Sequence, residues 1–274
     1  MQSMYRYWLL IPLLLQCGFA WSLPQHLPAP GGIAVIPLPA GNETARVFFN
    51  EKPQAVVTEK GKTYALIGIP LDTTVGRQLA EIRQNGHTIP VAFEVLSRHY
   101  ATQKLRIPDK RMVTPPPEVE ARIASEHIRL TEFKNHFSDT APETAFTLPA
   151  TGRLSSRFGL KRVLNGEPRS PHAGLDLAIG TGTPVRAPAA GTVLAVEDFY
   201  FTGGTVIIDH GQGLLTLYAH LSKVDVTPGQ KLQQNEAFAA SGVSGRITGP
   251  HLHWVVLLGG TAVEPELFLP GKVQ

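Results

Sequence analysis

The sequence predicts a mainly β protein: a small N-terminal β sandwich, a helical connector and a C-terminal antiparallel β-sheet domain. Two regions of short strands are separated by the run Pro115-Pro116-Pro117, after which the clearest helical pattern of the chain begins. Glycine and proline, 26 and 23 of the 274 residues, mark frequent turns on both sides of that helix. A chain of this length can bury the cores of two ordinary domains.

Residues 1–22 have the layout of a secretory signal peptide. Arg6 supplies a basic residue, an apolar run follows from Trp8 to Leu15, and the small residues Ala20 and Ser22 both suit a cleavage site. The run is too short to span a bilayer comfortably, so we expect no stable membrane insertion after signal cleavage. The expected location is the periplasm, or an exported position at the cell envelope.

The single cysteine and the net charge exclude a few further properties of the protein. Cys17 lies in the signal segment, so the mature chain would form no disulfide, and Gln16 before it argues against a lipoprotein box. The formal net charge is +3, without a block of Lys or Arg. No nucleic-acid partner is therefore expected, and the charge indicates at most a mild preference for anionic cell-wall polymers.

Residues 23–107 are predicted to form the N-terminal β domain. Short runs rich in hydrophobic residues alternate with turns of Gly, Pro, Asn and Asp. The predicted strands are Ala34–Leu38, Ala45–Phe49, Gln54–Thr58, Thr63–Ile69, Gln78–Gln84 and Thr88–Val95. We expect their hydrophobic residues to form a core, with a sheet edge that contacts substrate or a partner as the alternative.

Residues 108–145 are predicted to be a linker with a helix over Glu118–Phe137. Hydrophobic residues recur among charged ones at Val119, Ile123, Ile128, Leu130 and Phe133. The segment is shorter than three heptads, which argues against a coiled coil, so a connector packed on one or both domains is expected.

Residues 146–274 supply histidines from three distant segments, in a region of strands and Gly-rich turns. His251 and His253 are two apart in a predicted strand and therefore point to the same face. His172 and Asp176 are four apart, but Gly174 between them and Pro171 before them favour a loop that runs into a strand over a helix. His220 lies in the third segment, Leu217–Leu221.

Four imidazoles and one carboxylate suit a hydrolytic zinc site. Such a site needs about three protein ligands, an open position for water and a nearby acid–base group. The helical His-Glu-x-x-His motif is absent, so the site would lie on a β scaffold.

These segments resemble the lysostaphin/LytM-type zinc metallopeptidases, which are peptidoglycan endopeptidases. H-A-G-L-D (172–176) and H-L-H (251–253) match the two zinc-ligand motifs of that family, and Y-A-H-L (218–221) matches its third histidine motif. The resemblance covers roughly residues 147 to 270, and the stretch before His172 is similar to a Gram-negative subgroup with an additional N-terminal β domain. Val255, where many relatives have Glu, departs from the pattern at a position that is not a ligand.

The resemblance implies that His172, Asp176 and His253 bind one Zn²⁺ per chain, while His220 and His251 stay unligated beside it. The chemistry agrees, because further imidazoles on zinc would fill the water position, whereas a free imidazole exchanges protons near neutral pH. We favour His251 as the general base and His220 as the oxyanion partner, an order that the sequence does not decide. The implied reaction is hydrolysis of stem or crosslink peptides of peptidoglycan by metal-activated water.

Several alternatives stay open at this level. A catalytically inactive LytM-like domain that activates cell-wall amidases is one, although such domains typically lose metal-site residues. A lipoyl- or biotinyl-type carrier lacks a lysine in the expected turn. The residues do not indicate which peptide bond is cleaved, whether an envelope regulator acts on the protein, or whether the N-terminal domain and linker cover the groove.

Overall fold

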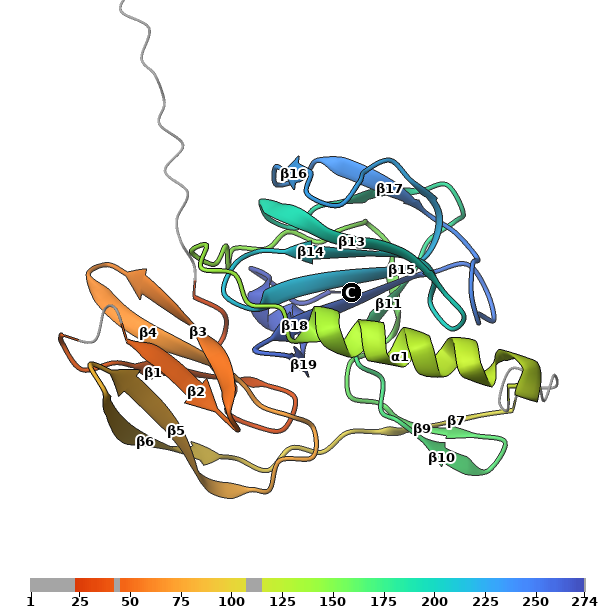
Figure 1. Cartoon of the computed structure of the whole chain (residues 1–274). Helices are drawn as coiled ribbons and strands as arrows, with labels where there is room; N and C mark the ends of the chain where they lie inside the picture. Colours follow the sequence, from red (N-terminus) through yellow and green to blue (C-terminus); the bar gives the residue numbers. More distant parts are fainter. Residues whose placement is uncertain (1–22, 42–44, 107–114, 274) are drawn as a thin grey trace, which may run out of the picture.

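The computed structural model describes residues 23–41, 45–106 and 115–273, and it confirms the predicted mainly β class (Figure 1). The predicted signal peptide, residues 1–22, lies outside the described residues. Within the described ranges, no helix combines the length and the apolar character that a membrane crossing requires.

The N-terminal region is a six-stranded antiparallel sheet in the order β1-β4-β3-β2-β5-β6. Its strands are β1 (Ile33–Pro37), β2 (Arg46–Phe49), β3 (Lys52–Glu59), β4 (Lys62–Gly68), β5 (Gly76–Gln84) and β6 (His87–Val95). Strand β3 pairs with β2 through its first residues and with β4 from Ala55 onward, so the sheet folds over on itself. Buried side chains from both halves, among them Val47, Phe49, Ile67 and Ile82, form a core between them.

A strand that the sequence did not indicate connects the two halves of the molecule. β7 (Thr102–Leu105) runs parallel to β9 (Lys161–Leu164), and β9 also pairs with β10 (Glu167–Arg169). These three strands form a small separate sheet in the order β10-β9-β7, below the end of the large sheet in Figure 1. The chain therefore leaves the N-terminal region by joining a sheet of the C-terminal region.

The C-terminal region is built on a ten-stranded antiparallel sheet, whose central order is β16-β13-β14-β15-β18-β11-β8. Its strands are β8 (Arg153–Ser156), β11 (Leu175–Ala178), β12 (Pro184–Arg186), β13 (Gly191–Phe199), β14 (Gly203–Asp209), β15 (Leu214–Val224), β16 (Lys231–Leu232), β17 (Ala237–Ser241), β18 (Leu252–Leu258) and β19 (Thr261–Val263). Alternate residues of β18 face two different cores. Trp254 and Val256 belong to the main core, and Val255 and Leu257 to a second one on the other face.

Helix α1 (Glu120–Lys134) covers that second core with Leu130 and Phe133, after a short 3₁₀ turn at Pro117–Val119. Its polar side is tied to β13, because Arg129 pairs with Glu197 and Arg122 donates to the Asp198 carbonyl at 2.9 Å. Ile128, which the sequence pattern placed among the packing residues, is 61% exposed. The packed face of the helix is thus narrower than its hydrophobic pattern indicates.

The two β regions are in direct contact. Ile33 and Leu66 of the N-terminal sheet belong to the same buried cluster as Leu258 and Val263 of the C-terminal sheet. Gln212, in the turn before β15, accepts a hydrogen bond of 2.8 Å from the Val56 amide of β3. These contacts give the C-terminal sheet a fixed neighbour on the side away from the histidines.

Candidate functional site

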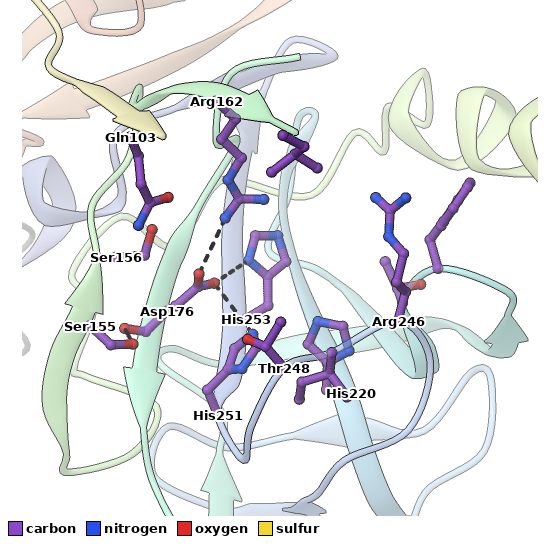
Figure 2. A pocket seen from close by; sticks show the side chains of 14 residues that line it. Gln103, Ser155, Ser156, Arg162, Asp176, His220, Arg246, Thr248, His251 and His253 are labelled. Carbon is purple, nitrogen blue, oxygen red and sulfur yellow. Dashed lines mark hydrogen bonds and ion pairs between the residues drawn. The ribbon is translucent and has the colours of Figure 1, made fainter. Parts of the chain in front are cut away.

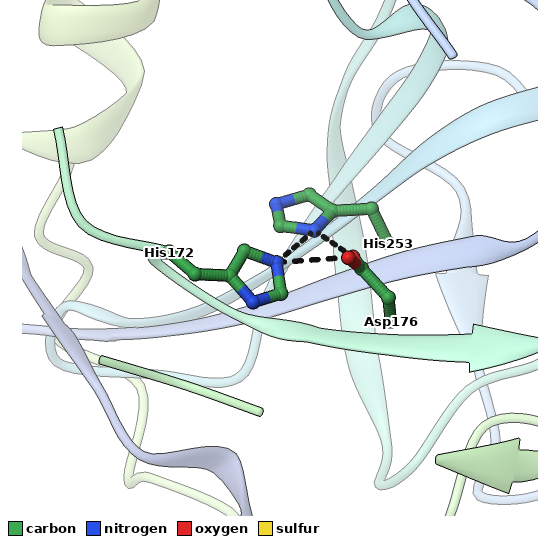
Figure 3. Close-up of side chains that lie close together, drawn as sticks. All are labelled: His172, Asp176 and His253. Carbon is green, nitrogen blue, oxygen red and sulfur yellow. Dashed lines mark hydrogen bonds and ion pairs between the residues drawn. The ribbon is translucent and has the colours of Figure 1, made fainter. Parts of the chain in front are cut away.

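Three of the predicted residues converge on one point (Figure 3). Asp176 on β11 and His253 on β18 are direct partners in the antiparallel ladder, and His172 lies on the loop that leads into β11. The Asp176 Oδ1 atom is 2.7 Å from His253 Nδ1 and 3.0 Å from His172 Nε2, and the two nitrogens are 3.1 Å apart. One ligand atom from each residue lies within 4.8 Å of the other two.

The loop that carries His172 is held close to β18 by Gly174. A Cβ atom at this position would come within 2.3 Å of the Trp254 carbonyl oxygen, so only glycine fits between the loop and β18. The His172 ring is 1% exposed, and its Nδ1 donates to the Arg157 carbonyl at 2.8 Å. Because a carbonyl only accepts, the proton lies on Nδ1, and the lone pair of Nε2 is directed at the other two residues.

The electrostatics of the three residues fit a bound cation. Burial alone would raise the pKa of Asp176, but the close approach of the His172 and His253 rings outweighs that effect and lowers the pKa below its usual range. Burial also lowers the pKa of His253, which keeps that ring neutral. An ionised carboxylate and two neutral imidazoles are the donor set that divalent transition metals prefer.

His220 and His251 lie beside this set and are oriented differently. His220 Nδ1 donates to the Ser244 carbonyl at 2.9 Å, and His251 Nδ1 donates to the Gly249 carbonyl at 2.9 Å. The two rings lie edge to face with centroids 4.8 Å apart, and His251 Nε2 is 3.8 Å from Asp176 Oδ1. Both rings therefore keep an Nε2 lone pair available on the cleft side.

His220 has an unusual backbone. Its φ of 64° lies in the left-handed region, where the regular pairing of β15 is interrupted. Burial lowers the pKa of His220 to about 4, so the ring is neutral at neutral pH. Strain of this kind persists where the surrounding structure determines the conformation, and it is common at functional sites.

Four of the five predicted residues, Asp176, His220, His251 and His253, line a cavity of about 370 Å³ (Figure 2). His172 is not among its lining residues and contacts Asp176, which is. The sequence did not indicate the other polar lining residues, among them Gln103 of β7, Arg162 of β9 and Arg246 of the loop before β18. Arg162 Nη2 is 3.4 Å from Asp176 Oδ2. The alternation of β9 could have indicated a facing Arg162, but nothing local indicates that β7 or residue 246 reaches the site.

His210 shows how a structural histidine differs from these. Both of its nitrogens have partners at 2.8 Å, with Nδ1 bonded to the Ala190 carbonyl and Nε2 to Thr216 Oγ1. The residue is 2% exposed, and burial lowers its pKa to about 4. With no nitrogen left for another ligand, His210 is part of the core.

Comparisons with known proteins agree with this geometry. Residues 170–265 match the model of peptidase family M23, and residues 26–98 match the model of the peptidase family M23 N-terminal domain. A crystal structure of a protein assigned to peptidase M23 from Pseudomonas aeruginosa superposes with a TM-score of 0.74 at 38% identity, over 88% of this chain and 94% of that one.

Two curated relatives match less than half of the chain. The peptidoglycan DD-endopeptidase ShyA of Vibrio cholerae is 39% identical over 112 residues, which are 40% of this chain and 26% of the relative. A metalloprotease of Haemophilus influenzae, otherwise uncharacterised, is 42% identical over 132 residues, 46% of this chain and 27% of the relative. The match therefore spans about a quarter of the length of these two relatives.

Proposed function

The chain belongs to peptidase family M23, and we propose that it is a zinc-dependent endopeptidase that hydrolyses peptide bonds in peptidoglycan. The observation that carries this proposal is the convergence of His172, Asp176 and His253 in a cleft that also contains two imidazoles with open nitrogens. The similarity to a peptidoglycan DD-endopeptidase supports the substrate class.

The three converging residues would hold one metal ion per chain. A zinc ion bound there lowers the pKa of a water toward ~7 and polarises the carbonyl that is attacked. The lowered pKa of Asp176 keeps its carboxylate ionised, and the Arg157 carbonyl keeps the His172 ring in the orientation that presents Nε2.

The two flanking histidines would move protons. We assign the general base to His251, whose Nε2 lies nearer to the ligand set, and the proton it takes then passes to the leaving amine. His220 would stabilise the oxyanion. Because its neutral ring has a lone pair at Nε2, His220 must first take up a proton before it can donate there.

Location and partners follow from the same proposal. Peptidoglycan is the expected partner, and export by the predicted signal peptide at residues 1–22 would bring the protein to the periplasm or the cell envelope. The alternative is an inactive domain that activates amidases. The presence of all five site residues, four of them lining one cleft and His172 in contact with Asp176, favours the enzyme.

The test is hydrolysis of purified cell walls by a chain that starts at residue 23. We expect about one zinc per chain, release of uncrosslinked muropeptides detected by mass spectrometry, loss of that release with a chelator, and its recovery with added zinc. Undiminished hydrolysis by metal-free protein would overturn the mechanism. Absence of hydrolysis together with stimulation of an added amidase would favour the activator.

A further inference from the structure

The small sheet beside Asp176 carries a row of polar side chains across its three strands, and two of them, Gln103 and Arg162, line the cavity. Arg162 is the middle residue of this row, because its ladder partners on the two neighbouring strands are Gln103 and Arg169. Like charges directly opposite each other in an antiparallel pair are destabilising. The charge of Arg169 is offset by an ion pair with Glu167 on its own strand. Arg162 instead faces Asp176, with 3.4 Å between Arg162 Nη2 and Asp176 Oδ2.

Arg246 adds a positive charge from a different part of the chain. Its backbone amide donates to the Phe201 carbonyl at 2.9 Å, and its guanidinium stacks over the Phe201 ring, 4.2 Å from the centroid. A Cβ atom on Gly245 would come within 2.4 Å of the Gly203 amide nitrogen, so the two loops touch backbone to backbone. This contact positions Arg246 at the cleft before any ligand arrives.

The positive charges of the cleft exceed the negative ones. Arg162 and Arg246 both line the cavity, and Asp176 is the acidic residue among its described lining residues (Figure 2). A divalent ion on the three ligands would more than offset that carboxylate. Burial and the nearby charges of Arg162 and Arg169 lower the pKa of Arg246.

Arg162 also has unused hydrogen-bonding capacity. Its Nε atom is buried and has no hydrogen-bond partner among the residues that the structure describes. Buried donors are normally paired, since leaving one unpaired is destabilising. A guanidinium with an unpaired nitrogen is suited to a carboxylate, which it can bind through two parallel hydrogen bonds.

We propose that Arg246 and Arg162 form a carboxylate-binding subsite, which selects substrates with a free carboxylate on the carbon that bears the scissile amide nitrogen. The inference rests on the proposed function and deepens it. Arg162 contacts Asp176, so a carboxylate held by the two arginines lies next to the reacting carbonyl.

This subsite distinguishes the two bond classes that the sequence left open. In a crosslink from D-alanine to the side-chain amine of diaminopimelate, the carbon next to the scissile nitrogen has its own carboxylate. In a glycyl-glycine bridge, the corresponding carbon bears the carbonyl of the next peptide bond in place of a free carboxylate. The positive wall therefore favours the diaminopimelate crosslink.

The experiment uses two synthetic crosslinked peptides that differ only at this group, one with the free carboxylate and one with the carboxamide. Hydrolysis is measured with the zinc-loaded protein, and equilibrium binding with the same protein after metal removal. We expect wild type to prefer the carboxylate peptide in both assays. Arg246→Gln should lower kcat/KM for that peptide by roughly 10- to 100-fold, mainly through KM, as expected for one lost charge-assisted hydrogen bond.

Two control variants separate recognition from folding and from general charge effects. Arg246→Lys keeps the charge and should retain part of the preference, whereas Arg77→Gln removes an exposed arginine of β5 and should change nothing. Metal content and thermal unfolding are measured for each variant. Arg246 is the better probe because Arg162 also touches a metal ligand.

The outcomes are distinct for the two proposals. Equal treatment of the two peptides by wild type, or an equal loss for both in Arg246→Gln, would overturn the subsite while leaving the peptidase in place. Preferential binding of the carboxylate peptide without hydrolysis would support the subsite and contradict the proposed activity. Hydrolysis with a preference that Arg246→Gln removes supports both.

Discussion

The two sides of the cleft hold their histidines in different ways. On one side, atoms of His172, Asp176 and His253 lie 2.7 to 3.1 Å from one another. On the other, His220 and His251 are each fixed through Nδ1 to a backbone carbonyl, and the nearest carboxylate oxygen to His251 is 3.8 Å away. Side chains that converge on one point suit a shared cation, whereas rings fixed from behind keep one nitrogen for proton transfer.

His253→Ala tests the converging side and should have the largest effect. The substitution removes the Nδ1 atom that lies 2.7 Å from Asp176 Oδ1, and with it one of three ligand atoms. We expect zinc content to fall from about one per chain to near zero, measured by mass spectrometry of the metal after dialysis, and wall hydrolysis to disappear. His127→Ala, on the exposed side of α1, is the matched control.

His251→Ala and His220→Ala test the side that is fixed by backbone carbonyls. Neither residue belongs to the converging set, so zinc content should stay near one per chain. Loss of a general acid–base group typically lowers turnover by ~10²- to 10⁴-fold, and we expect both variants in that range. If His251→Ala loses zinc while His253→Ala keeps it, the roles of the two histidines of the H-L-H segment have been assigned in reverse.

Local periodicity indicates part of the histidine arrangement. The two-residue period of a strand places His251 and His253 on one side, and Gly174 with Pro171 favours a loop over a helix for His172. The ladder that places Asp176 opposite His253 depends on pairing between strands 77 residues apart, and only the structure defines it.

The remainder of the cleft could not be predicted for the same reason. β7 reaches the site through parallel pairing with β9. The four residues of β7 have no distinctive pattern, so the sequence does not indicate that they pair with a strand 59 positions later. Arg246 depends on two glycine loops meeting backbone to backbone. Likewise, the exposed Ile128 shows that periodicity predicts a helix more reliably than it predicts which face is covered.

His210 provides the comparison with the smallest expected effect on catalysis, because both of its nitrogens bond to groups in the core. His210→Gln removes the titrating ring and keeps a polar side chain. Metal content and turnover of the folded variant should match wild type. The variant should instead differ in its response to acid.

The sign of that response follows from the pKa of His210, which burial lowers from 6.5 to about 4 in the folded state. The unfolded chain therefore binds more protons than the folded one between these pH values. The stabilisation from the neutral buried ring is fully present above about pH 6.5 and is lost as the pH falls toward 4, by up to about 3 kcal/mol. Urea unfolding at a series of pH values, with metal removed from both proteins, measures this loss. The free energy of unfolding of wild type, relative to that of His210→Gln, should decrease by that amount on acidification. If this difference in free energy stays constant from pH 7 to 4, His210 does not carry the acid sensitivity.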